Sequence, residues 1–505
     1  MTSAQDFSAS LLASLVDLGV KDFYLAPGSR SQSLAIAAGQ LAEAGLARLT
    51  VRLDERSMGF MALGSAMGTK RPSVVITTSG TAVANLHPAV LEAHHSGVPL
   101  ILLTADRPKS LRGKGANQTT NQVGIFADAL RDLVDVSVPE LGEFDPADLA
   151  RNAITRAIGQ GATLQPGPVQ LNLQFQEPLS SAEPNASHLV GRLQPLQAPG
   201  TTPSELEVVI SDSAVVIAGS QAGEDARKFA EAAGLPLFAE PSSGSRYGDC
   251  VITDYPKQLI DGKSQQVKQV FVFGKPTLSR AVMKLIKESE TWVQSSTAHG
   301  LFDPFSSVLG SAEKLVPVGR AAETWLASWK QHSSKPTRRG KLASLIWNTT
   351  SSNEQLLFGA SQIIREAENC LPSKEISVFA NRGLAGIDGT VSTALGLAQS
   401  GSKTRALMGD LTLLHDASGL NTSGLGELNV QLIVGNDGGG EIFRHLEVAQ
   451  QLDESKLSQL FLTPQQVRLE GLAQAYGWQY FETSSLEELT EVLPKDGLWL
   501  IDFQL

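Results

Sequence analysis

Short apolar runs rich in β-branched residues recur along the whole chain and alternate with helical stretches. This alternation predicts parallel sheets covered by helices, because two parallel neighbours need a crossover connection and a helix usually supplies it. We therefore expect an α/β protein built from doubly wound parallel sheets. The expected strands are residues 23–26, 49–53, 73–78, 100–104, 169–173, 214–218, 270–273, 292–294, 377–380, 405–408, 431–434 and 498–503.

The chain is long enough to require more than one hydrophobic core, since its length is 505 residues. Two polar stretches interrupt the strand–helix pattern. Residues 180–205 are rich in Ser, Pro and Gly, and residues 330–341 are rich in basic and polar side chains, so both are interpreted as exposed connections. The sequence thus predicts three α/β domains, at residues 1–182, 205–332 and 345–505.

Charge and cysteine content exclude several classes of function. The formal net charge is −11, from 41 basic and 52 acidic residues, which speaks against a nucleic-acid or anionic-membrane surface. The two cysteines, Cys250 and Cys370, form no CxxC pair, so neither a disulfide framework nor a thiolate zinc site is expected. The N-terminus lacks the features of a signal peptide, and no apolar stretch is long enough to span a bilayer. We expect a cytoplasmic protein.

The clearest chemical signal lies in the last third of the chain, where two motifs each follow an apolar run. Gly409, Asp410 and Leu411 follow one run, and Asp437 precedes three glycines, 438–440, after the next. The two aspartates are 437 − 410 = 27 residues apart, which leaves room for one crossover and brings both carboxylates to one sheet edge. Either motif alone is more simply a strand-end turn or a flexible loop. Together they predict a magnesium–diphosphate site.

This pair of motifs resembles the signature of thiamine-diphosphate enzymes, which opens with Gly-Asp and closes with Asn-Asn or a near variant. The resemblance implies that Asp410, Asp437 and the carbonyl of Gly439 hold Mg²⁺ or Mn²⁺ against the cofactor's diphosphate, with Gly409 and Leu411 beside it. Asp437 stands where many relatives have Asn. The exchange keeps an oxygen ligand and adds a negative charge.

Glu55 follows the apolar run 49–53 and precedes a helix rich in small residues. The resemblance implies that Glu55 is the carboxylate that activates thiamine by hydrogen-bonding its aminopyrimidine ring. Taken alone, Glu55 would as readily cap the helix or pair with Arg56. Three further residues are assigned to the cofactor by resemblance: Thr81 and Asn85 in a strand-to-helix turn, and Ile387 as the apolar wedge beneath the bent thiamine. The alternative for Ile387 is a core isoleucine in a glycine-rich turn.

Four arginines in motif contexts suggest substrates with several carboxylates, because a guanidinium binds a carboxylate through two parallel hydrogen bonds. They are Arg30, Arg107, Arg280 and Arg365. Each one alone is more often a surface or salt-bridged arginine. Polar residues accompany them at expected strand or helix ends: Ser29 beside Arg30, Asn117 and Gln118 after Arg107, and Ser361 four residues before Arg365.

As a set, the motifs resemble the menaquinone-pathway family that makes 2-succinyl-5-enolpyruvyl-6-hydroxy-3-cyclohexene-1-carboxylate. APGSRS, LDER, TSGTAVAN, TADRP, GANQ, ANRGLAGIDG, GDL and NDGGGEIF follow in that family's order, and the resemblance is thin only in the middle third. It implies the three-domain fold of thiamine enzymes, with pyrimidine-binding, middle and diphosphate-binding domains. It also implies decarboxylation of 2-oxoglutarate and 1,4-addition of the resulting succinyl-semialdehyde carbanion to isochorismate, in a homodimer or homotetramer with active sites at the subunit interface.

The same resemblance implies roles for individual residues. Glu55, Gln118, Arg30, Ser361 and Arg365 are the expected catalytic residues, with Gln118 a candidate for proton handling. Ser29, Arg30, Arg107, Asn117, Gln118, Arg280, Ser361 and Arg365 are expected to bind substrates or orient intermediates. Some positions depart from the family: Ser279 stands where some members have a lysine, and Gly438 stands where many relatives have an asparagine. The stretch between Trp329 and Glu354 is shorter than usual, and the end at Leu505 is early.

Two other functions compete with this one. Another thiamine-dependent decarboxylase or carboligase, such as an acetolactate-synthase-like enzyme, often binds FAD in its middle domain. Here the segment 218–223 has only a weak Gly-x-x-x-Gly and no dinucleotide fingerprint. A catalytically silent binder of thiamine diphosphate would not need Glu55 together with Asp410 and Asp437.

Overall fold

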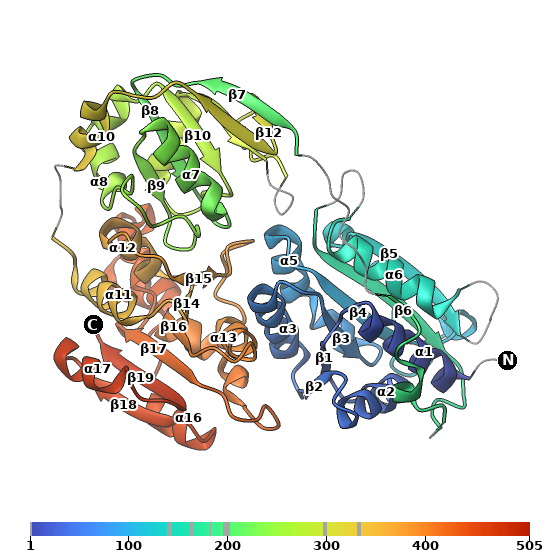
Figure 1. Ribbon diagram of the computed structural model, residues 1–505. Coiled ribbons are helices and arrows are strands. Elements are labelled where there is room, and N and C mark those ends of the chain that lie inside the picture. Colours follow the sequence, from blue (N-terminus) through green and yellow to red (C-terminus); the bar gives the residue numbers. More distant parts are fainter. Residues whose placement is uncertain are drawn as a thin grey trace. The chain divides into compact units, whose positions relative to one another are not determined.

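The structure is a computed structural model that describes residues 3–138, 144–160, 165–181, 183–194, 203–295, 300–330 and 335–505. Its larger sheets are parallel and carry helices, as Figure 1 shows, which confirms the expected α/β class. Contacts between Cα atoms divide the chain into two compact units. Unit 1 comprises Met1–Gly200, Val391–Ser400 and Ser418–Glu427, and unit 2 comprises Thr201–Thr390, Gly401–Ala417 and Leu428–Leu505. The division into three domains stays a prediction.

The sheet of unit 1 has six strands in the order β2-β1-β3-β4-β6-β5. Their bounds are β1 Asp22–Leu25, β2 Arg48–Val51, β3 Ser73–Thr77, β4 Leu100–Asp106, β5 Asp132–Val138 and β6 Pro168–Phe175. Side chains alternate between the two faces of a strand, so each strand contributes to two layers of core. One layer packs against helices α1 (Ala4–Asp17), α2 (Gln32–Glu43) and α6 (Pro146–Ala157).

Helix α3 (Glu55–Thr69) of unit 1 packs closely against residues 391–398 of helix α13 (Thr390–Ala398). A Cβ on Gly64 would lie 2.2 Å from the carbonyl oxygen of Thr393, and a Cβ on Gly396 would lie 2.1 Å from that of Met61. Larger side chains at these two glycines would push the helices apart. The small-residue composition of α3 therefore follows from close helix–helix packing.

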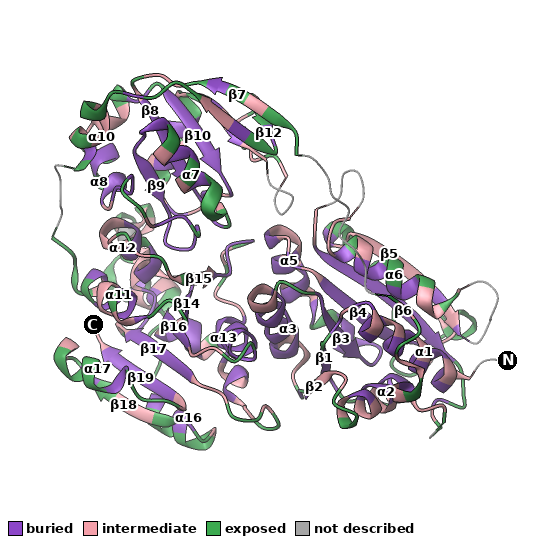
Figure 2. Cartoon of the chain, in the orientation of Figure 1, coloured by how far each residue is buried: buried purple, intermediate pink, exposed green. Residues whose placement is uncertain are grey.

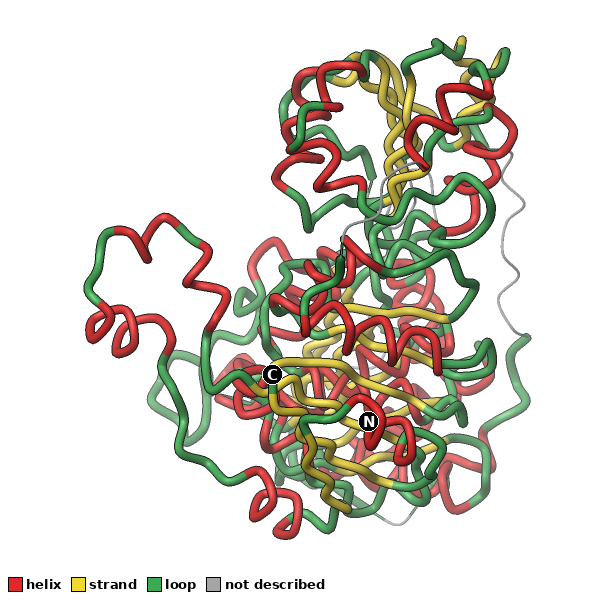
Figure 3. The backbone as a smooth tube through the Cα atoms, turned by 90° about the vertical axis from the view of Figure 1, so that its left-hand side faces the viewer, coloured by secondary structure: helices red, strands yellow, loops and turns green. Residues whose placement is uncertain are grey.

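The first sheet of unit 2 has five strands in the order β12-β11-β10-β8-β9. They are β8 Ala214–Ala218, β9 Leu237–Ala239, β10 Gln269–Phe273, β11 Glu290–Gln294 and β12 Val308–Ala312, with β7 Glu205–Val209 and β13 Lys314–Val318 paired separately. Helices α7 (Gly223–Ala233), α8 (Tyr255–Ile260), α9 (Arg280–Glu288) and α10 (Glu323–Lys330) accompany it. Figure 3 shows helices on both sides of these strands.

The second sheet of unit 2 has the order β15-β14-β16-β17-β19-β18. Its strands are β14 Gln355–Phe358, β15 Ser377–Ala380, β16 Thr404–Gly409, β17 Val430–Asn436, β18 Gln479–Thr483 and β19 Leu498–Gln504. Helices α11 (Arg338–Thr349), α12 (Gln362–Cys370) and α17 (Leu486–Val492) supply apolar residues to one core with these strands. In Figure 2 the central strands β17 and β19 are largely buried, whereas the outer surface of α17 is exposed.

Every strand expected from the sequence is present, with ends displaced by up to two residues. The expectation that residues 330–341 form an exposed connection is wrong at its end, because α11 begins at Arg338. Thr337 caps this helix by accepting a hydrogen bond from the backbone N–H of Gly340 at 3.0 Å. Residues 331–334 of that connection, and 182 and 195–202 of the other, lie outside the described residues.

Candidate active site

The predicted site residues of unit 1 lie just after the carboxyl ends of its parallel strands. Ser29 and Arg30 follow β1, Glu55 follows β2, Thr81 and Asn85 follow β3, and Arg107, Asn117 and Gln118 follow β4. Strands β2, β1, β3 and β4 are consecutive neighbours in the sheet, so these loops share one edge. This edge is where open α/β sheets bind ligands.

Gly28 allows the loop after β1 to lie against the loop after β3. A Cβ on Gly28 would lie 2.2 Å from the Cβ of Thr78, which leaves no room for any side chain. The next contact follows from this closeness: the backbone N–H of Arg30 donates to Oγ1 of Thr78 at 3.3 Å. Arg30 also donates through Nη1 to the carbonyl of Phe175 at 3.2 Å, at the end of β6.

Arg107 and Gln118 form one cluster with Ser79, a residue that the sequence analysis missed. Nη1 of Arg107 donates to the carbonyl of Gln118 at 2.8 Å and also to Oγ of Ser79. Nε2 of Gln118 donates to the carbonyl of Ser79, and Oγ of Ser79 donates to the carbonyl of Gln118, both at 2.9 Å. Gln118 is exposed and has a φ of 53°, which is a left-handed backbone conformation. It makes its hydrogen bonds with Ser79 and Arg107 in this conformation.

The fully buried Gln122, which the sequence motifs did not indicate, hydrogen-bonds to β4, to β6 and to the loop after β3. Its Oε1 accepts a hydrogen bond from the backbone N–H of Gly80 at 2.9 Å. Its Nε2 donates to Oδ1 of Asn172 at 2.9 Å and to the carbonyl of Ala105 at 3.2 Å. A polar side chain that is fully buried and fully bonded fixes the relative positions of its partners.

Arg30 and Arg107 each bring a positive charge to this edge. Burial, and then the charge of Arg107, lower the pKa of the Arg30 guanidinium below its ordinary value. An anion bound beside both guanidinium groups would stabilise the charge of Arg30.

Glu55 stands in the first turn of α3 and does not cap it. Asp54 is the cap, because its Oδ1 accepts from the backbone N–H groups of Arg56 at 2.9 Å and Ser57 at 3.3 Å. The half-buried Glu55 accepts instead, through Oε2, from the side-chain amide of Asn85 at 3.1 Å. The structure thus places together two residues that the sequence analysis had assigned separately to the cofactor.

In unit 2 the two acidic motifs end neighbouring parallel strands. Gly409, the last residue of β16, is in register with Gly435 of β17. Asp410 begins α14 (Asp410–His415), and Asp437 follows β17 directly. Burial raises the pKa of Asp410 to about 6, and the charge of Asp437 adds to this rise. A carboxylate whose proton affinity is raised by a neighbouring carboxylate is suited to bind a cation together with it.

Arg339, a third residue that the sequence analysis missed, pairs with Asp437. Its Nη2 lies 2.5 Å and its Nε 3.1 Å from Oδ2 of Asp437. Burial raises the pKa of Asp437, and the hydrogen bond and charge of Arg339 act in the opposite direction. The sequence signal for Arg339 was the start of α11, which the prediction of an exposed connection overlooked.

The donor set fits a magnesium site only if a backbone carbonyl takes part. Among the described residues no group of three or more His, Cys, Asp or Glu side chains could hold a metal. Gly439 has a φ of 145°, and a Cβ there would lie 2.4 Å from the carbonyl oxygen of Leu462. Glycine alone therefore allows this backbone conformation beside Asp437. Two carboxylates and a carbonyl are oxygen ligands of the kind that Mg²⁺ accepts.

The predicted basic residues of unit 2 lie around the loop before α9. Nη1 of Arg365 donates to the carbonyl of Leu278 at 2.7 Å. Arg280, two residues on, forms an ion pair at 2.9 Å with Glu447, and both side chains are exposed. Ser361 caps α12 by accepting from the backbone N–H of Ile363 at 3.1 Å, so it precedes the helix that carries Arg365.

The same loop is held by two further buried side chains that the sequence analysis missed. Glu240 accepts hydrogen bonds from the backbone N–H groups of Thr277 at 2.6 Å and Leu278 at 2.8 Å. Arg382, in the motif that contains Ile387, donates through Nε to Oγ1 of Thr277 at 2.9 Å. Ile387 itself is half-buried.

Comparison with known proteins identifies relatives along almost the whole chain. Residues 5–125 match the family "Thiamine pyrophosphate enzyme, N-terminal TPP binding domain". A 2-succinyl-5-enolpyruvyl-6-hydroxy-3-cyclohexene-1-carboxylate synthase of Leifsonia xyli is 41% identical over 99% of this chain and 96% of its own length. A synthase of the same description from Clavibacter michiganensis is 41% identical over 97% of this chain and 93% of its own length. Another from Nocardioides is 40% identical over 99% of this chain and 95% of its own length.

Proposed function

The chain belongs to the 2-succinyl-5-enolpyruvyl-6-hydroxy-3-cyclohexene-1-carboxylate synthase family of thiamine-diphosphate enzymes, and from this premise we propose how its residues act. The reaction is the decarboxylation of 2-oxoglutarate and the 1,4-addition of the remaining four-carbon unit to isochorismate. The observation that carries this function is the identity of 41% across 99% of the chain. Bound thiamine diphosphate supplies the electron sink that lets a 2-oxo acid lose carbon dioxide.

In this proposal Glu55 holds a proton at the aminopyrimidine ring of the cofactor. The side-chain amide of Asn85 supports this role, because its hydrogen bond to Oε2 fixes the orientation of the carboxylate. The exposed Thr81 is the first residue of the short helix α4 (Thr81–Ala84), and Asn85 is the C-cap residue of that helix. Ile387 provides an apolar contact for the cofactor, because its half-buried side chain is partly accessible to a ligand.

A divalent cation, Mg²⁺ or Mn²⁺, is proposed to bind Asp410, Asp437 and the carbonyl of Gly439. The charge of Asp437, which raises the pKa of Asp410, supports this, since a dication would relieve the repulsion between the two carboxylates. Gly409 and Leu411 flank Asp410, and the backbone N–H of Leu411 donates to the Asp410 carboxylate. These residues would hold the diphosphate end of the cofactor.

Both substrates are dicarboxylates, and the proposed binding residues offer matching donors. Burial and the charge of Arg107 lower the pKa of Arg30, so a substrate carboxylate beside both guanidinium groups would stabilise the charge of Arg30. Ser29, Asn117 and Gln118 are exposed at the same sheet edge. Ser361, Arg365 and Arg280 provide the donors of unit 2. Gln118 is the proposed proton-handling group, with Ser79 and Arg107 holding its loop.

The oligomer and the location of the protein are also proposals. We expect a homodimer or homotetramer with active sites at subunit interfaces, as the family resemblance implies. No helix in the described part of the chain combines the length and apolarity needed to cross a membrane. We propose a cytoplasmic location from the family resemblance alone.

Product analysis by mass spectrometry tests the proposed function. The purified protein receives thiamine diphosphate, Mg²⁺, 2-oxoglutarate and isochorismate, with controls that omit each in turn. We expect the isochorismate adduct of the decarboxylated unit. Glu55→Gln should lower its formation by roughly two to four orders of magnitude, because the ring loses its proton partner. Glu43→Gln, at an exposed position of α2, is the matched control and should be fully active.

The other outcomes assign other functions. Carbon dioxide release without an adduct would indicate a different thiamine-dependent decarboxylase or carboligase. Bound cofactor with no reaction of either substrate would indicate a silent thiamine-diphosphate binder.

A further inference from the structure

The ion pair between Arg339 and Asp437 is one-sided. Both donated hydrogen bonds, from Nη2 at 2.5 Å and Nε at 3.1 Å, end on Oδ2 of Asp437. A fork-to-fork pair would instead engage both carboxylate oxygens. Oδ1 of Asp437 therefore receives neither of the two bonds from Arg339.

The two side chains are held in a partly buried setting, where their charges count. The side chain of Arg339 is 21% exposed and that of Asp437 is 16% exposed. Charges in such positions interact more strongly than on an open surface, because less solvent screens them. The negative charge of Glu441 also acts on Asp437, and the positive charge of Arg339 acts in the opposite direction.

The neighbouring Arg338 shows that this pairing is specific to one arginine. Nη2 of Arg338 donates to the carbonyls of Ser484 at 2.7 Å and Gln504 at 2.9 Å, and its guanidinium lies 5.3 Å from the centre of the Phe503 ring. Thr337 fixes the start of α11, and with it the direction of both side chains. Of these two arginines, Arg339 is the one that contacts the proposed metal ligand.

We propose that Arg339 is a charge-compensating partner that makes Asp437 act as a neutral, single-oxygen ligand. An aspartate in place of asparagine adds one negative charge beside the cation and the diphosphate. The guanidinium on Oδ2 cancels that charge and leaves Oδ1 to face the cation, as the amide oxygen of asparagine would. Arg339 is thus a positioning residue of the cofactor site. This inference rests on the proposed metal site.

A double-mutant cycle at Arg339 and Asp437, made in the full chain, tests the inference. Mn²⁺ binding is measured by electron paramagnetic resonance of the free ion, with saturating thiamine diphosphate and no substrate. Asp437→Asn leaves Arg339 uncompensated, and should weaken Mn²⁺ binding by about tenfold. Arg339→Met leaves Asp437 fully charged, and should tighten it by about tenfold. The double variant restores the neutral ligand, and should bind within about threefold of the unmodified protein.

Two controls separate charge from folding. Arg338→Gln removes the same charge from the same helix turn, and should leave Mn²⁺ affinity within about twofold, because that guanidinium points to other partners. Arg339→Lys keeps the charge without the guanidinium fork, and should bind within about threefold, which also serves if Arg339→Met fails to fold.

The outcomes are distinct. Equal Mn²⁺ affinity in Arg339→Met and the unmodified protein, or a double variant as weak as Asp437→Asn, would overturn the inference and leave the metal site standing. Failure of the unmodified protein to bind Mn²⁺ in the presence of thiamine diphosphate would overturn the metal site and the inference together.

Discussion

Gly28 illustrates how a single residue controls the proposed substrate edge. The space that a side chain would need is taken by Thr78, whose Cβ lies 2.2 Å from the position of a Cβ on Gly28. The loop after β1 can follow this path only without a side chain, and Arg30 reaches its contacts with Thr78 and Phe175 from there. Glycine is required here for space, whatever its backbone flexibility.

Gly28→Ala is expected to destabilise the protein by about 1 to 3 kcal/mol, because the added methyl must displace Thr78 or the loop. It should also lower the rate of product formation, since Arg30 moves with the loop. Gly39→Ala in α2 is the matched control: nothing lies within 4 Å of its Cβ position. This change should stabilise by about 0.5 to 1 kcal/mol, as alanine favours a helix interior. Urea unfolding of both variants checks the opposite signs.

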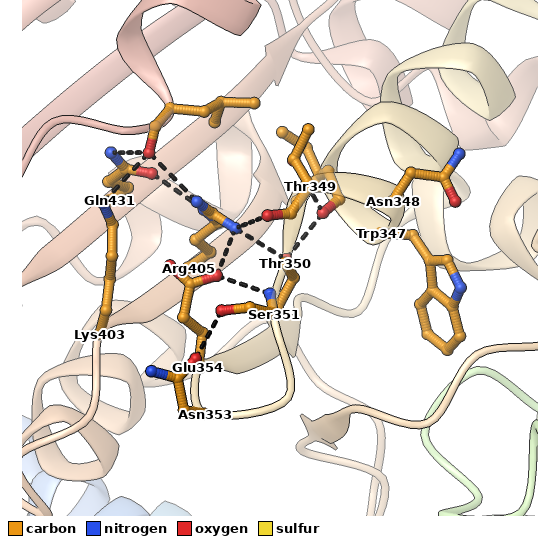
Figure 4. Close-up of polar contacts among 12 residues, drawn as sticks. Trp347, Asn348, Thr349, Thr350, Ser351, Asn353, Glu354, Lys403, Arg405 and Gln431 are labelled. Carbon is orange, nitrogen blue, oxygen red and sulfur yellow. Dashed lines mark hydrogen bonds and ion pairs between the residues drawn. The ribbon is translucent and has the colours of Figure 1, made fainter.

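At the scale of elements, the start of strand β16 is anchored by one buried arginine. Figure 4 shows the side chain of Arg405 among Glu354, Thr349, Thr350 and Gln431. Its Nη1 lies 2.9 Å from Oε2 of Glu354, and its Nε donates to Oε1 of Gln431 at 3.1 Å. This arginine links the loop after α11 to β16 and β17, the two strands whose far ends carry the proposed metal ligands.

Arg405→Met is expected to destabilise the protein by about 3 to 5 kcal/mol, because it leaves the largely buried carboxylate of Glu354 without its ion-pair partner. Glu354→Gln should cost less, about 1 to 2 kcal/mol, since Arg405 keeps its other acceptors. The double variant should cost less than the two single changes added together. Thermal and urea unfolding measure these differences. Additive losses would mean that the pair is not coupled.

At the scale of the whole molecule, unit 2 joins its two sheets through buried ionisable groups. Glu368 of α12 accepts a hydrogen bond from the hydroxyl of Tyr255 in α8 at 2.5 Å. Arg246, also buried, donates to the carbonyls of Glu368 at 3.1 Å and Leu371 at 2.7 Å. Burial raises the pKa of Glu368 to about 8, and the nearby Glu240 contributes to the rise. The junction therefore favours a protonated Glu368.

This arrangement predicts a stability that depends on pH. The folded state keeps the Glu368 proton up to a pKa of about 8, whereas the unfolded chain loses it near 4.5. The contribution of Glu368 to stability is fully present below the lower value and is lost as the pH rises toward the higher one, by on the order of 2 to 4 kcal/mol. Glu368→Gln should flatten this fall, because glutamine stays neutral and still accepts from Tyr255.

Urea unfolding at a series of pH values measures the effect. Glu375→Gln, at an exposed position just before β15, is the control and should retain the fall. An equal pH dependence in Glu368→Gln and the unmodified protein would show that another group is responsible.

Local patterns in the amino-acid sequence predict the strands of this protein and the sheet edges at which the proposed site residues lie. Apolar runs mark strands, and the residues that follow them, such as Asp410 and Glu55, must lie at the carboxyl edge of a parallel sheet. These signals are local, because a strand and the turn after it are contiguous in the chain. They sufficed to predict the α/β class and the family.

The partners of those residues depend on long-range packing. Arg339 and Asp437 are separated by 98 positions in sequence, and Arg365 meets the carbonyl of Leu278 across 87. No periodicity or spacing links such residues, because their contact depends on how whole sheets and helices pack. The buried Gln122 carried no local signal either: its importance comes from the three strand ends that meet around it. Local chemistry therefore predicts where a site lies, and long-range packing determines how its charges are balanced.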